Sequence, residues 1–110
     1  MRQMVISRLI VLRKKMGYSA RELSAKINRA ENYIARIESG NHFPPIEDIE
    51  CILKTCNSSF EELFYEDFDS YSIDKEILKK LKDIKPEGKK ALITLLVYMY
   101  QNEKGKIQAV

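Results

Sequence analysis

At 110 residues, 45% of them hydrophobic, the chain has the size and core material of one compact domain with a small appendage. One histidine and two cysteines are too few for the usual four-ligand zinc site, and a charged fraction of 32% is expected of a soluble protein. The net charge is only +3, but residues 1–45 hold nine Lys or Arg and three Asp or Glu, as a surface facing nucleic-acid phosphates requires.

The first part of the sequence predicts two helices followed by a tight turn. Apolar residues at helical spacing predict a first helix over residues 3–16. Ser19 followed by Glu22 is a capping box, which opens a second helix over residues 20–27. Asn28 suits the turn that follows, because asparagine tolerates the left-handed conformation better than any residue except glycine.

A third helix is expected over residues 31–39, with Ile34 and Ile37 facing inward and Gly40 ending it. Together with the helix before it, this segment has the pattern of a unit that can place one helix end in the major groove of DNA. Its exposed residues would then decide what the protein reads.

Two further helices complete the first part of the chain. Pro44 and Pro45 suit the start of a fourth helix, and Ser59 caps a short fifth one. In the fifth helix the inward residues are expected to be Phe60, Leu63 and Phe64. Residues 66–72 are acidic and predicted to be an irregular linker. No strand pattern is found, so the predicted class is all-α.

The C-terminal part, residues 73–110, is predicted to form a two-helix hairpin, with the second of its helices running from Pro86 to about Glu103. That helix has two apolar stripes, whereas a surface helix has one. The extra stripe predicts a dimer interface; packing within the same chain is the alternative. The residues expected in the interface are Ile93, Leu96, Val97 and Tyr100.

Neither membrane insertion nor secretion is expected. The longest apolar run, residues 91–100, is too short to cross a bilayer. Residues 1–15 interrupt their apolar positions with Arg8 and Arg13 and do not have the pattern of a secretory leader. A cytoplasmic protein is therefore expected, with both cysteines reduced.

Short motifs follow one another in order over residues 5–64. They include L-R-K-K at 12–15, G-Y-S at 17–19, R-I-E-S-G at 36–40 and F-E-E-L-F at 60–64. This series resembles the lambda-repressor-like helix-turn-helix family, the Cro/CI or XRE class of bacterial and phage regulators. The resemblance implies a five-helix DNA-binding domain over residues 1–65, whose second and third helices contact double-stranded DNA.

The resemblance also implies roles for individual residues. Arg13 and Glu38 would form a structural pair between the first and third helices. Bases would be read by Glu31, Asn32 and Arg36, whose side chains suit the edges of cytosine, adenine and guanine. Phosphates would be contacted from six positions on the second helix and the flanking loops, namely Ser19, Ala20, Arg21, Arg29, Asn41 and His42.

The predicted function is that of a sequence-specific transcriptional regulator, a repressor that binds a palindromic operator as a dimer. Four residues depart from the family pattern: Ala20, Arg29, Ala30 and Glu31. They keep a second hypothesis open, a protein-interaction module of the same fold, antitoxin-like or anti-repressor, that binds another regulatory protein. No enzyme, metal or small-molecule cofactor is expected, because the sequence has no phosphate-binding loop, nucleophile elbow or metal cluster.

Overall fold

The structure is a computed structural model that describes residues 1–108; residues 109–110, the end of the predicted hairpin, lie outside it. The described residues form seven α-helices and one 3-10 helix and contain no strand, which confirms the all-α class. None of the helices within this range is both long and apolar enough to cross a membrane. The chain divides into two compact units, Met1–Tyr71 and Ser72–Val110, which are described one at a time.

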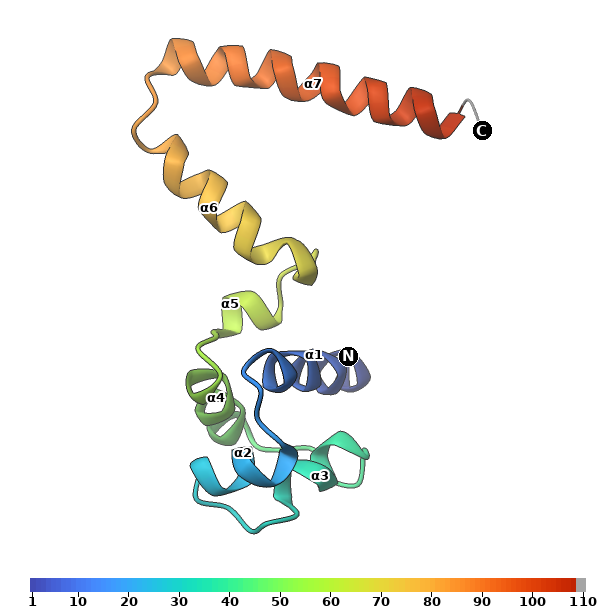
Figure 1. The fold of residues 1–110 in the computed structure, drawn as a ribbon, viewed down its shortest axis with the longest axis vertical. Coiled ribbons are helices and arrows are strands. Elements are labelled where there is room, and N and C mark those ends of the chain that lie inside the picture. The colour runs from blue at the N-terminus through green and yellow to red at the C-terminus, as the bar shows by residue number, and fades with distance from the viewer. Residues whose placement is uncertain (109–110) are drawn as a thin grey trace. The chain divides into compact units, whose positions relative to one another are not determined.

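The first unit contains five α-helices gathered around one core (Figure 1). They are α1 (Arg2–Lys15), α2 (Ala20–Lys26), α3 (Tyr33–Glu38), α4 (Ile46–Thr55) and α5 (Phe60–Leu63). Each helix contributes at least one buried apolar residue, for example Leu12, Leu23, Ile37, Ile52 and Leu63. Burial of such a side chain contributes about 1.5–3 kcal/mol, so these residues are the main source of stability of the first unit.

The turns form where the sequence predicts them. Ser19 and Glu22 make both hydrogen bonds of the capping box at the start of α2. Asn28 has a φ of 58°, which confirms the predicted left-handed turn between α2 and α3. Gly40 has a φ of 84° after α3, a conformation that a residue with a side chain rarely adopts.

Three local predictions were wrong. Helix α3 begins at Tyr33, so Glu31 and Asn32 lie in the preceding turn, which is closed by the bond from the Tyr33 N–H to the Ala30 carbonyl at 2.9 Å. Phe64 is 52% exposed, because α5 ends at Leu63 and Phe64 only stacks on Phe60.

The third correction concerns the predicted linker at residues 66–72, which is neither irregular nor free of the core. Phe68 is buried and begins a 3-10 helix, Phe68–Ser70. The Arg8 side chain on α1 holds the segment before it, because Nη1 donates to the carbonyls of Leu63 and Tyr65, both at 2.7 Å. The Arg8 guanidinium also lies 5.0 Å from the centre of the Phe68 ring.

The second unit consists of α6 (Tyr71–Leu81), whose first residue still belongs to the first unit, and α7 (Pro86–Gln108). In contrast to the first unit, no residue from 72 to 104 is buried. Large apolar side chains on both helices are therefore in contact with water. Residues 72–104 therefore form no hydrophobic core of their own.

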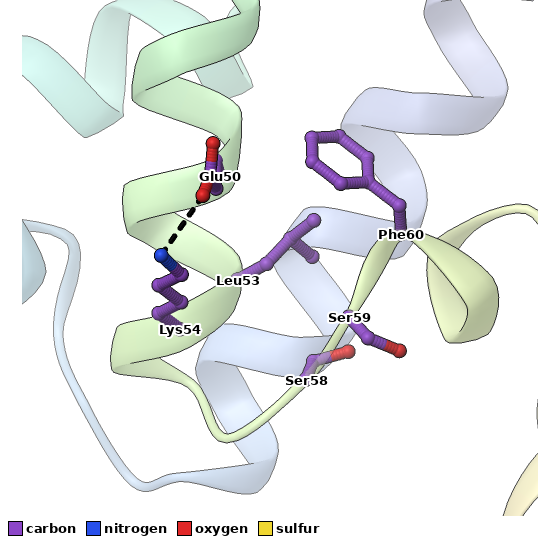
Figure 2. A pocket seen from close by; sticks show the side chains of 6 residues that line it. All are labelled: Glu50, Leu53, Lys54, Ser58, Ser59 and Phe60. Carbon is purple, nitrogen blue, oxygen red and sulfur yellow. Dashed lines mark ion pairs between the residues drawn. The ribbon is translucent and has the colours of Figure 1, made fainter.

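A small hollow lies between α4 and the loop that leads into α5 (Figure 2). Leu53 and Phe60 contribute its apolar walls, and the Glu50–Lys54 ion pair, 2.8 Å, crosses one side. Its volume of about 180 Å³ is below the roughly 300–1,000 Å³ of pockets that enclose drug-sized ligands. We assign it no role.

Candidate nucleic-acid interface

The N-terminus of α2 is the first part of the predicted DNA-binding pair. The Ser19 Oγ accepts from the Glu22 N–H at 3.0 Å, and Glu22 Oε1 accepts from the Ser19 N–H at 3.1 Å. The capping box uses the N–H groups of Ser19 and Glu22. Within the described residues of this turn, the N–H groups of Ala20 and Arg21 have no hydrogen-bond partner. Those two N–H groups could bind a phosphate oxygen, and the Ser19 hydroxyl, which accepts in the capping box, could donate its O–H to the same group.

In the turn between α2 and α3, a residue predicted to read bases, Glu31, contacts a residue predicted to bind phosphate, Arg21. Glu31 Oε1 accepts from Arg21 Nη2 at 2.8 Å, and the two side chains are 76% and 73% exposed. An ion pair so exposed is worth about 0–1 kcal/mol, so either partner can exchange it for a contact with DNA. Asn32, the next residue, is exposed as well.

Arg36 lies on the exposed side of α3, and its backbone organises the loop that follows. The Arg36 carbonyl accepts from the N–H of Asn41 at 3.0 Å and from that of His42 at 3.2 Å. Since these two N–H groups are used internally, a phosphate contact at Asn41 or His42 would have to come from the side chains. The His42 ring lies 5.4 Å from the ring of Tyr33.

The C-terminal end of α3 is held to α1 by the pair that the resemblance implies. Arg13 Nε donates to Glu38 Oε2 at 2.6 Å, and Nη2 donates to Oε1 at 2.9 Å. The two side chains are only 12% and 18% exposed. A bidentate arginine–carboxylate contact fixes direction as well as distance, so this pair orients the end of α3.

Two contacts that the sequence did not reveal hold the other parts of α3. Ser24 on α2 is buried, and its Oγ accepts from the Ile34 N–H at 3.0 Å. Asp48 on α4 is also buried, and it accepts from the Arg29 side chain at 2.5 Å and from the Tyr33 hydroxyl. The sequence alone did not indicate these contacts, because the partners of Ser24 and Asp48 lie on other elements.

The Asp48 contacts change the interpretation of Arg29. Arg29 was predicted to contact phosphate, but its guanidinium binds Asp48, 19 residues later, and lies 5.5 Å from the centre of the Tyr33 ring. The hydrogen bonds from Tyr33 and Arg29 lower the pKa of Asp48 below its ordinary value, although burial opposes the shift. Burial and the bond to Asp48 raise the pKa of Tyr33 to about 12.

The residues predicted to form a dimer interface lie on α7, in the second unit. Ile93, Leu96, Val97 and Tyr100 are 50–62% exposed. Their spacing of three and four places them on one face of the helix. These four residues therefore form an exposed apolar face on α7.

Comparison with known proteins also indicates a helix-turn-helix fold. A family model described as helix-turn-helix matches residues 9–63, half of the chain. A solved structure of the SinR protein/SinI protein complex is similar over 91% of this chain and 98% of that chain, with 25% identity and a TM-score of 0.53. The comparison with curated proteins found no match. The chain belongs to the lambda-repressor-like, or XRE, class of helix-turn-helix DNA-binding regulators.

Proposed function

We propose that this regulator is a repressor that binds a specific operator as a homodimer in the cytoplasm, with α3 and the turn before it in the major groove. Glu31, Asn32 and Arg36 read bases in this proposal. The observation that carries it is their common exposure, in the turn before α3 and on its open side, while contacts from Arg13, Asp48 and Ser24 hold the opposite side of the helix.

The distribution of charge supports the same surface. Residues 1–45 have a net charge of +6, and the nearby cations include Arg21 and Arg36. Phosphates would be bound by the N–H groups of Ala20 and Arg21 and by the side chains of Arg21, Asn41 and His42. The Arg29 side chain is 47% exposed and uses Nη2 for Asp48, so it would add its positive charge to this surface from a fixed position.

Dimerisation would occur through residues 73–103. The exposed apolar face of α7 supports this part of the proposal, because no residue from 72 to 104 in the second unit is buried. A two-fold dimer presents two reading helices, which would fit successive major grooves about 34 Å apart and therefore an inverted repeat.

Arg36 gives the sharpest test of base reading. Arginine forms a bidentate contact with guanine, whereas lysine keeps the charge but loses the fork. Using fluorescence anisotropy with an operator obtained by selection from random duplexes, we expect Arg36→Lys to lose about tenfold or more in affinity. It should also lose its preference at one base pair. If Arg36→Lys kept both, the residue would be a phosphate contact and its assignment would be wrong.

A second function is favoured by two specific observations. Glu31 places a carboxylate on the proposed reading surface and binds one of its cations, and the similar solved structure is a complex of two different proteins, SinR and SinI. A protein-interaction module would bind another regulator through α7. In that case Arg36→Ala would leave the activity intact, while changes at Leu96 or Tyr100 would abolish partner binding.

A further inference from the structure

Helix α3 is too short to define its own direction. It has six residues, and the residue before it, Asn32, makes no side-chain capping bond. Isolated helices shorter than about 12 residues are marginal in water. The orientation of α3, and of the turn that carries Glu31 and Asn32, must therefore be set by contacts with other elements.

One carboxylate makes two of those contacts, on both sides of this turn. Asp48 is 8% exposed and lies in the first turn of α4. Its Oδ1 accepts from Arg29 Nη2 at 2.5 Å, before the turn, and its Oδ2 accepts from the hydroxyl of Tyr33, the first residue of α3. Both oxygens of a single buried group thus define where the chain enters α3.

We propose that Asp48 is a positioning residue for DNA reading, which presents Glu31 and Asn32 to the bases by holding Arg29 and Tyr33. The inference rests on the proposed function and deepens it, because it names what sets the geometry of the reading turn. Asp48 itself does not touch DNA in this scheme.

The energetics favour orientation over stability as the purpose of the contact. The Arg29 side chain is 47% exposed, so its ion pair with Asp48 adds little net stability. The contact is nevertheless restrictive in its geometry, since each carboxylate oxygen of Asp48 binds a different partner, Arg29 or Tyr33. The Arg13–Glu38 pair at the other end of α3 has the same character. Together the two carboxylates restrain both ends of the helix.

The test compares Asp48→Ala with Glu47→Ala in the full chain. Glu47 is the adjacent residue in the same first turn of α4, but it is exposed, so its removal controls for the loss of one negative charge. Amide hydrogen exchange by NMR is measured for α2 and α3. Affinity is measured at several salt concentrations for the selected duplex and for a random duplex.

For Asp48→Ala we expect exchange in α3 to become at least tenfold faster while α2 is unchanged. The ratio of specific to random binding should fall about tenfold, and the salt dependence of random binding should stay the same, because the phosphate contacts remain. A purely structural role would not change that ratio in the folded protein. Glu47→Ala should change each quantity less than twofold.

Tyr33→Phe is the second variant, because it removes only the hydroxyl and keeps the ring. It should shift exchange and specificity in the same direction, about threefold, even if Asp48→Ala does not fold. Variants that fold and match Glu47→Ala in both readouts would overturn the inference. If the parent protein selected no duplex, the proposed function would be refuted. Faster exchange in α3 of Asp48→Ala would then mean that the Asp48 contacts serve the fold alone.

Discussion

The two units of the chain use their apolar residues in opposite ways. In the first unit, 14 hydrophobic residues are buried around α1–α5 and the 3-10 helix. In the second unit no residue from 72 to 104 is buried, and Ile93, Leu96 and Tyr100 are each more than 60% exposed. The first unit thus buries its large apolar side chains in one core, whereas the second exposes many of its own to water.

This difference suggests a division of labour. Three polar contacts of the first unit hold α3, from Arg13, Ser24 and Asp48. Among the described residues of the second unit, the main feature is the exposed apolar face of α7. Recognition of DNA and assembly would therefore be separable by mutation, and each change below should affect one unit and leave the other intact.

The largest effect is expected from Leu96→Glu. A carboxylate in a buried interface would be left without a partner, which costs several kcal/mol and should weaken dimerisation about 100-fold or more. Sedimentation velocity measures the change, and the thermal unfolding of the first unit should stay the same. Asn102→Glu, on the opposite side of α7, is the matched control. Equal dissociation in both variants would exclude this face as the interface.

Phe68→Ala should be the most damaging of the changes within the first unit. Phe68 is 8% exposed and lies against the Arg8 guanidinium, and truncating a buried phenylalanine costs about 3–5 kcal/mol. Urea unfolding measures the loss. Phe64→Ala removes the same ring from a site that is 52% exposed, so it should cost much less. Similar losses would mean that Phe68 is not part of the core.

Arg13→Ala should destabilise the first unit by about 2 kcal/mol, less than the 3–5 kcal/mol typical of a fully buried pair. The reduction is expected because the Arg13 and Glu38 side chains keep some contact with water. The same urea unfolding experiment applies. Arg21→Ala, which breaks the exposed pair with Glu31, should stay within about 0.5 kcal/mol.

The smallest effect is a pH dependence at Asp48. Its pKa is lowered in the folded state, chiefly by the bond from Tyr33. The stabilisation is therefore complete above the unfolded pKa of about 3.9 and is lost as the pH falls through the lower folded value. The difference in unfolding free energy between the parent and Asp48→Asn should shrink as the pH falls from about 5 through the lowered folded-state pKa. A constant difference would contradict the shift.

Local sequence patterns predicted the helices and turns of the first unit because their causes are local. The capping box at Ser19 and the left-handed turn at Asn28 depend on residues within four positions. The start of α3 was misplaced for the same reason, since Ala30 provides no cap and the helix begins only where Tyr33 meets Asp48.

Contacts between residues far apart in the chain could not be predicted from the sequence alone. Arg29 and Asp48 are 19 residues apart, and each taken separately reads as a surface charge. Phe68 stands in an acidic stretch whose composition indicated a linker, but it joins the hydrophobic core and contacts Arg8 and Lys15 of α1, more than 50 residues earlier in the chain. The Arg13–Glu38 pair was foreseen through the family resemblance, not through spacing.

Selection of binding sites from random duplexes, performed in parallel with the parent protein and Leu96→Glu, tests the division of labour most directly. We expect the parent to enrich an inverted repeat with half-sites about 10 base pairs apart. The monomeric variant should enrich a single copy of the same half-site with lower affinity. If the parent enriched no sequence, sequence-specific DNA recognition by the first unit would be contradicted. If both proteins enriched the same repeat equally well, dimerisation through the second unit would be contradicted.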